Sequence, residues 1–290
     1  MKSRNLPVSM LRILCIVVGF LFAITAECEN GYRLWLRYDK ISNPTIIKEY
    51  KSSVTGIFSE GNSPVINSAL DELKIGLSGL LGIQIPVTSS IDRNGIIVVG
   101  TPSESKLISS LKLHDELQNS GEEGFLIVSA NYKKKNIIVI AGNTDRGVLY
   151  GTFRFLRLIQ TQGDIRDLHI SESPKVKVRI LNHWDNLDRT VERGYAGLSL
   201  WDWKSLPDSV SQRYIDYARA NASIGINGTV LTNVNANALV LTPEYLKKVA
   251  RLADIFRSYG IRVYLTARFS APVEIGKLST ADPLQPEVIE

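Results

Sequence analysis

Hydrophobic and polar residues follow two different periods along the first half of the chain, and each period predicts a type of element. Apolar residues recur at helical spacing in "SPVINSALDELKIGLSGLLG" and "DRGVLYGTFRFLRLIQ", which predicts helices over residues 63–82 and 145–160. Short apolar runs predict strands at residues 95–100, 124–130 and 136–142, and the alternation in "GYRLWLRYD" predicts an edge strand at residues 31–39. Together these elements indicate a small α/β layer domain.

The pattern changes after Pro174, where near-continuous apolar runs alternate with helices. Such runs are typical of parallel strands that are buried on both faces. Thr242, Pro243 and Gly260 mark the helix before the last run as its cap, its first residue and its stop. The predicted strands of these consecutive βα units are residues 176–184, 226–234 and 261–269.

Each of these strands carries polar or aromatic residues at its carboxyl end, in the clusters 182–186, 233–235 and 268–269. In a (β/α)8 barrel that end of the strands is the active-site face, so we expect the clusters to bind a ligand. Too few residues follow Pro174 for a barrel of about 200–250 residues. The predicted fold class is therefore α/β: an N-terminal α/β layer domain followed by the first βα units of a (β/α)8 (TIM) barrel, truncated after its third strand.

Composition indicates a folded chain whose partner is not nucleic acid. Hydrophobic residues make up 44% and charged residues 22% of the 290 residues, as in an ordinary globular protein. The formal charge of +5 is spread over segments of mixed sign. His183 has no second histidine at ligand spacing, so we expect it to form structural hydrogen bonds and predict no metal site.

The N-terminus predicts export. Lys2, Arg4 and Arg12 precede an apolar stretch at residues 13–24, which is shorter than the about 20 residues of a membrane span. We therefore predict a signal peptide at residues 1–26, a periplasmic or extracellular protein and no stable membrane anchor; an uncleaved anchor is the alternative. The remaining chain is expected to contain the α/β domain at residues 27–173 and the incomplete catalytic barrel at residues 174–290.

Three segments resemble one known family. "RILNHWDNLDRTVERGYAG" at residues 179–197, the opening "GYRLWLRY" and the final "TADPLQPEVIE" are similar to the α-glucuronidases of glycoside hydrolase family 67. The resemblance implies an inverting hydrolase that needs no metal or other cofactor and that can form a homodimer when complete. It also implies glucuronoxylan-derived oligosaccharides as partners, from which (4-O-methyl)glucuronic acid is released at the α-1,2 linkage. Leu198, where a basic residue is expected, and "TARFSAP" depart from the family pattern.

The resemblance also assigns substrate-binding residues. Trp184 would form a wall of the pocket that receives the uronic acid, because the C–H side of a sugar ring is apolar and packs on an indole. The other candidates are Asp185 and Asn186, which would shape the pocket, Val234, which would face the 4-O-methyl group, and the charged residues Glu192 and Arg268. The alternatives are a core position for Trp184 and structural or capping roles for Asp185, Asn186 and Glu192.

No catalytic residue is predicted within this chain. Inverting hydrolysis needs two carboxyl groups about 6.5–9.5 Å apart. By resemblance these groups follow later barrel strands, so neither Glu274 nor Glu290 is assigned, and the 290-residue chain alone is expected to be inactive. Two other classes stay open: a β-hexosaminidase-like barrel hydrolase, and a non-catalytic carbohydrate-binding module.

Overall fold

The structure is a computed structural model that describes residues 29–194 and 197–289. The chain divides into two compact units, Met1–Arg37 and Tyr38–Glu290, which are taken separately below. The predicted signal peptide at residues 1–26 lies outside the described residues, as do both cysteines. Within the described part, no helix is both long and apolar enough to cross a membrane.

In the first unit, the edge strand predicted at residues 31–39 is wrong. The chain there forms the short 3-10 helix η1 (Leu34–Arg37). Side chains of Glu29 and Asn30 accept hydrogen bonds from the N–H groups of Gly31 and Tyr32, and Arg37 donates to Glu29 over 2.9 Å. Alternating apolar residues do not suffice for a strand, because its backbone groups also need a partner strand.

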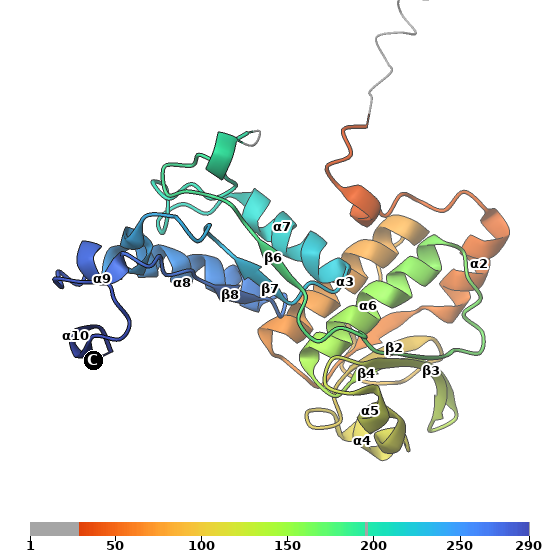
Figure 1. The fold of residues 1–290 in the computed structure, drawn as a ribbon. Coiled ribbons are helices and arrows are strands. Elements are labelled where there is room, and N and C mark those ends of the chain that lie inside the picture. The colour runs from red at the N-terminus through yellow and green to blue at the C-terminus, as the bar shows by residue number, and fades with distance from the viewer. Residues whose placement is uncertain (1–28, 195–196, 290) are drawn as a thin grey trace, which may run out of the picture. The chain divides into compact units, whose positions relative to one another are not determined.

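A mixed five-stranded sheet forms the first part of the second unit, and its strands are β1 (Gly56–Phe58), β2 (Ile96–Gly100), β3 (Phe125–Tyr132), β4 (Lys135–Gly142) and β5 (His169–Glu172). Their order across the sheet is β1-β2-β4-β3-β5; Figure 1 labels the central strands β2, β4 and β3. Strands β1, β2 and β4 run parallel, whereas β3 is antiparallel to both of its neighbours. The strands predicted at residues 95–100, 124–130 and 136–142 are confirmed by β2, β3 and β4.

Helices cover both faces of this sheet. α3 (Pro64–Leu81) and α6 (Asp145–Gln160) lie side by side on one face (Figure 1). α2 (Pro44–Ser53) contacts α3. α4 (Lys106–Ser110) and α5 (His114–Ser120) lie on the other face. The two predicted helices are confirmed, and Gly82 ends α3 with a left-handed backbone of φ 66°, which glycine adopts without a steric cost.

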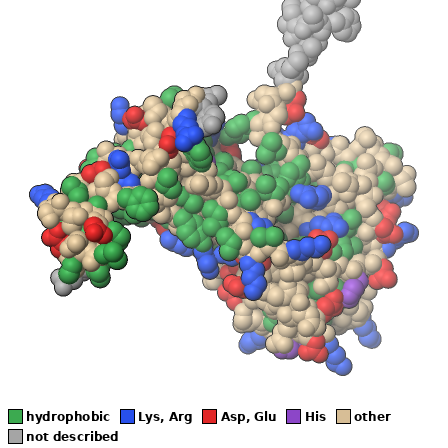
Figure 2. Space-filling model, viewed as in Figure 1, with side chains coloured by type: hydrophobic (Ala, Val, Ile, Leu, Met, Phe, Trp, Pro, Cys, Tyr) green, Lys and Arg blue, Asp and Glu red, His purple; other side chains and the backbone are tan. Residues whose placement is uncertain are grey.

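Some of the exposed charged side chains form ion pairs. Arg154 lies 2.9 Å from Glu172, and Arg257 lies 2.6 Å from Asp254. On the face that Figure 2 shows, Lys and Arg side chains accordingly lie among Asp and Glu side chains. Exposed ion pairs of this kind contribute only about 0–1 kcal/mol each to stability, so the fold depends on its apolar core.

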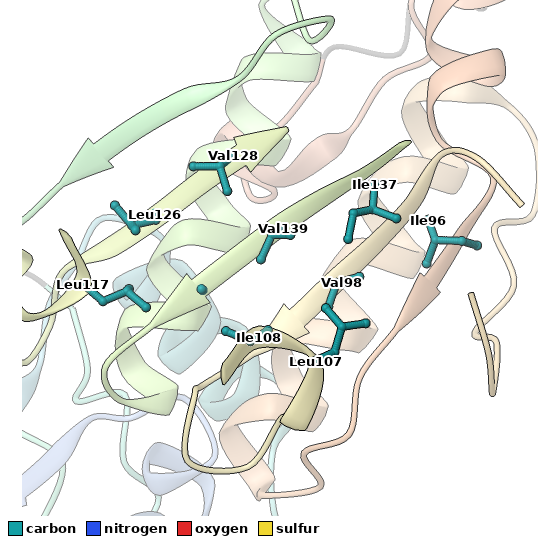
Figure 3. Packing of buried hydrophobic residues seen from close by; sticks show 10 residues of the cluster. Ile96, Val98, Leu107, Ile108, Leu117, Leu126, Val128, Ile137 and Val139 are labelled. Atoms are coloured by element: carbon teal, nitrogen blue, oxygen red, sulfur yellow. The ribbon is translucent and has the colours of Figure 1, made fainter. Parts of the chain in front are cut away.

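One cluster of the hydrophobic core lies between the sheet and the two short helices. Leu107, Ile108 and Leu117 from α4 and α5 pack against the apolar side chains of the central strands (Figure 3). The strand residues of this cluster are Ile96, Val98, Leu126, Val128, Ile137, Val139 and Ala141, all of them buried. Full burial of one large aliphatic side chain stabilises the folded state by about 1.5–3 kcal/mol, so this cluster contributes strongly to the stability of the sheet.

The second sheet is short and entirely parallel. It consists of β6 (Ile180–Asn182), β7 (Gly228–Val230) and β8 (Arg262–Tyr264), in sequence order. α7 (Gln212–Ser223) connects the first two strands, and α8 (Pro243–Arg257) connects the last two. All three strands are shorter than predicted, and β8 ends at Tyr264, well before the expected end at residue 269. Four short helices complete the unit: η2 (Glu192–Gly194), η3 (Ala238–Leu241), α9 (Ala271–Glu274) and α10 (Pro286–Ile289).

Candidate functional site

Directly after β6 the chain forms a hairpin, residues 184–192, which we call the tip hairpin. Asp185 and Val191 pair in an antiparallel bridge, and the N–H groups of Asn186 and Glu192 donate to the carbonyl oxygens of Thr190 and Trp184, each over 2.8 Å. Successive residues of such a ribbon point to opposite sides. The Trp184 side chain is therefore exposed to 43%, whereas Asp185 is exposed to only 6%.

Asp185 lies in a buried polar network beneath the hairpin. Its Oδ2 accepts a 2.6 Å hydrogen bond from Ser199 and lies 3.6 Å from Nδ1 of His183, whose Nε2 is 2.7 Å from the Tyr217 hydroxyl. Burial raises the pKa of Asp185, but His183 and Ser199 outweigh burial and hold this pKa below its usual value. Burial raises the pKa of Tyr217 to about 12. Asp185 is thus an ionised carboxylate that supports the hairpin from inside.

Amide side chains join the ends of β6 and β7. The backbone N–H and the side-chain amide of Asn233 donate to the Asp185 carbonyl over 3.1 and 3.3 Å, and the same amide donates to Asn186 Oδ1 over 2.5 Å. Asn235 donates from its side chain to Glu192 over 2.9 Å. The segment after β7 therefore fixes the hairpin on which Trp184, Asp185, Asn186 and Glu192 stand.

The last two predicted site residues are placed differently from each other. Val234 lies between Asn233 and Asn235, at the same edge of the sheet as the tip hairpin, and is exposed to 60%. Arg268 lies beyond the end of β8 and forms an ion pair with Glu274 over 3.3 Å. Among the described contacts, none joins Arg268 to the tip hairpin.

Three residues of this region were not predicted from the sequence. Ser199 and Tyr217 hold Asp185 and His183, and nothing in their spacing indicates that contact. Arg193 lies over Trp184, with its guanidinium carbon 5.8 Å from the ring centroid. Arg193 belongs to the family-like segment "VERGYAG", which is the signal that could have revealed it.

The site lies at the carboxyl edge of the second sheet, whereas one of the cavities of the described part lies near the beginnings of the three strands. That cavity has a volume of about 360 Å³ and is lined by residues that include Glu123, Arg146, Lys177, Asn227 and Arg262. Within residues 29–194 and 197–289, no group of three or more His, Cys, Asp or Glu side chains is arranged to hold a metal ion.

Sequence comparisons point to one family. The glycosyl hydrolase family 67 N-terminus matches residues 34–155, and the glycosyl hydrolase family 67 middle domain matches residues 158–290. "Probable alpha-glucuronidase A" of Aspergillus terreus is 35% identical over 285 residues, which are 97% of this chain and 33% of that protein. "Alpha-glucuronidase A" of Emericella nidulans is 33% identical over 281 residues, 93% of this chain and 32% of that protein. The chain thus spans about a third of the length of the curated relatives it matches.

A structural comparison agrees at the level of the fold. A solved family GH115 4-O-methyl-α-glucuronidase with specificity for decorated arabinogalactans has a TM-score of 0.51 and 17% identity, and the likeness covers 81% of this chain and 32% of that chain. At this identity the likeness concerns the fold alone. The two matches to family 67, which together run from residue 34 to residue 290, show that the chain belongs to glycosyl hydrolase family 67.

Proposed function

We propose that the protein is an α-glucuronidase, which releases glucuronic acid or its 4-O-methyl ether from the α-1,2 linkage of xylan-derived oligosaccharides by an inverting mechanism. Family membership supports this activity, as do relatives named alpha-glucuronidase that are 33–35% identical. The observation that carries the proposal within the structure is the exposed indole of Trp184 at the carboxyl end of β6.

The surroundings of Trp184 suit a sugar ring. The indole offers an apolar face for the C–H side of a pyranose. Asn186, Asn235 and Glu192 supply amide and carboxylate groups beside it that can bind hydroxyl groups. The exposed side chain of Val234 would contact the 4-O-methyl group. The buried Asp185 network holds the hairpin in place. The hairpin therefore loses little conformational entropy when the sugar binds.

The proposal extends to the architecture. Residues 174–290 would form the first βα units of a (β/α)8 barrel, behind an N-terminal domain at residues 27–173. Three parallel strands in sequence order, with α7 and α8 as their connections, support this arrangement. In such a barrel the active site takes residues from the ends of several strands, so the described residues would bind the uronic acid while the catalytic carboxyl groups follow other strands.

Export through a signal peptide at residues 1–26 is part of the proposal and is supported by the basic and then apolar pattern of that segment.

The activity is tested with the full-length protein and an α-1,2-glucuronosyl xylo-oligosaccharide. We expect release of glucuronic acid, and ¹H NMR should detect the β-anomer first because the mechanism inverts the configuration. An initial α-anomer would overturn inversion alone. If the folded protein releases no uronic acid but cleaves a β-N-acetylhexosaminide, the hexosaminidase-like alternative replaces the proposal.

A further inference from the structure

Arg193 lies beside Trp184 because the tip hairpin returns the chain to that place. The N–H of Glu192 donates to the Trp184 carbonyl over 2.8 Å, and the bridge between Asp185 and Val191 sets the register. The next residue, Arg193, therefore lies alongside the tryptophan, with its guanidinium carbon 5.8 Å from the ring centroid. Both side chains are exposed, so a ligand can reach the two groups together.

The charge of Arg193 has no counter-charge in the described part of the chain. No ion pair of Arg193 is found there, whereas Arg189 of the same hairpin is paired with Asp202 over 3.4 Å. The backbone of Arg193 is left-handed, with φ 61°, which is strained for a residue that carries a Cβ. Backbone strain of this kind is concentrated at ligand-binding and catalytic sites. Arg193 thus combines a strained backbone with guanidinium donors that a ligand can use.

We propose that Arg193 and Trp184 form one binding element for an acidic sugar, in which the ring packs on the indole and the guanidinium binds the carboxylate. The inference rests on the proposed function, and it adds the residue that selects a uronic acid over a neutral hexose. Arginine suits this role because its planar donors match the two oxygens of a carboxylate. An exposed cation–π contact is weaker than such charge-assisted hydrogen bonds, so Arg193 exchanges the indole face for the carboxylate when the sugar enters.

A competing explanation is that Arg193 only covers the indole in the free protein. The two roles have opposite consequences. A cover competes with every sugar that stacks on Trp184, so its removal strengthens the binding of charged and neutral sugars alike. A group that binds the carboxylate strengthens the binding of the charged sugar alone, so its removal weakens that binding and leaves the neutral sugar almost unaffected.

The test compares the affinities of the full-length protein for D-glucuronate and for its uncharged methyl ester, by titration calorimetry. Arg193→Gln is expected to weaken glucuronate binding about tenfold or more and to change ester binding by no more than about twofold. Arg193→Lys, which keeps the charge but not the planar donors, should retain part of the preference for glucuronate. Arg251→Gln removes an exposed arginine from α8, and this matched control should leave both affinities unchanged.

Each outcome of these titrations supports or overturns the binding of the sugar carboxylate by Arg193. Equal weakening of both ligands by Arg193→Gln, unchanged binding of glucuronate, or tighter binding of both ligands overturns the role of Arg193 and leaves the proposed function standing. If the folded wild-type protein binds neither ligand, the proposed function fails and this inference fails with it. The ratio of the two affinities does not depend on the fraction of folded protein, so it remains decisive even if a variant melts earlier.

Discussion

Trp184 and Asp185 are neighbours in the chain but have opposite surroundings. The tryptophan is 43% exposed, while the aspartate is 6% exposed and bonded to Ser199. The alternation of side chains along the tip hairpin produces this contrast. Substitution of the first residue should therefore affect binding, and substitution of the second should affect stability.

Trp184→Ala in the full-length protein is expected to lower kcat/KM for α-1,2-glucuronosyl xylo-oligosaccharides about tenfold to a hundredfold. The estimate follows from aromatic stacking on nucleic-acid bases, which contributes about 1–3 kcal/mol. The melting temperature should change little, because the side chain is exposed. Trp203→Ala, at a tryptophan that is 1% exposed, should instead lower the melting temperature strongly. Wild-type turnover in Trp184→Ala would place the pocket elsewhere.

Asp185→Asn is expected to lower the free energy of unfolding by about 1–3 kcal/mol at pH 7, because the buried site loses a charged acceptor. The folded-state pKa of Asp185 is lowered. The stability it contributes is therefore complete above the ordinary value of about 3.9 and is lost as the pH falls through the lower folded-state value. Urea unfolding at pH 7 and near pH 3 measures the effect, and the difference between the two proteins should be smaller at the acidic pH. Asp208→Asn, at an exposed aspartate, is the control, and an equal loss there would contradict the role of Asp185.

At the scale of elements, a buried charge pair joins α3 to α7. The Glu72 side chain is 3% exposed and accepts two hydrogen bonds from Arg219, each over 2.7 Å. The Tyr38 hydroxyl donates to the same carboxylate over 2.6 Å, and burial raises the pKa of this tyrosine well above its usual value, so the hydroxyl keeps its proton. Since α7 connects β6 to β7, the pair anchors the second sheet to the helix layer of the first.

Glu72→Gln is expected to destabilise the protein by about 3–5 kcal/mol, because it leaves the Arg219 charge without its buried partner. Asp71→Asn is a matched control one residue away, since Asp71 is exposed and forms a surface ion pair with Lys74. Its effect should stay within about 0.5 kcal/mol. Urea unfolding measures both variants. A loss at residue 72 no larger than the loss at residue 71 would mean that the pair makes no net contribution.

At the scale of the second unit, Glu123 connects the five-stranded sheet to the beginnings of β6 and β7. Its carboxylate accepts hydrogen bonds from Arg179 over 2.5 Å, from Asn227 over 3.0 Å and from Arg146. Burial raises the pKa of Glu123, but Arg179, Asn227 and Arg146 outweigh burial and hold this pKa below its usual value. The two sheets therefore share one carboxylate, and we expect them to unfold together.

Glu123→Gln is expected to lower the unfolding free energy by about 1–3 kcal/mol at pH 7. Wild-type stability from this residue is complete above the ordinary glutamate pKa of about 4.3 and is lost as the pH falls through the lower folded-state value.

Two spectroscopic probes test whether the two sheets unfold together. Far-UV circular dichroism follows all helices, while tryptophan fluorescence mainly follows the part that holds Trp184, Trp201 and Trp203. The two transitions should coincide in the wild type. Glu122→Gln, at the exposed neighbour, is the control and should change neither of the two transitions. Separate transitions of the wild-type protein would contradict the coupling of the two sheets.

The elements that the sequence predicted well are those whose causes are local. α6 has the predicted bounds, and α3 ends at Gly82 because a left-handed glycine can follow the last turn. The prediction of a strand at residues 31–39 was wrong, because this segment has no partner strand to pair with and forms a 3-10 helix instead. In the site, the position of the polar cluster after β6 could be predicted, but the exposure of each of its members could not.

The sequence by itself determined where the helices α3 and α6 and the strands β2, β3 and β4 lie, which family the chain resembles, and that polar residues follow the strand before Trp184. Helix hydrogen bonds join residues four positions apart, so the local sequence contains that information. Only the tertiary structure decided that Asp185 is buried against Ser199, that Arg193 lies over Trp184, and that Glu72 pairs with Arg219 across 147 positions. The reason is that burial and side-chain pairing depend on tertiary contacts between segments that are distant in the sequence. The periodicity of hydrophobic residues within one segment does not specify those contacts.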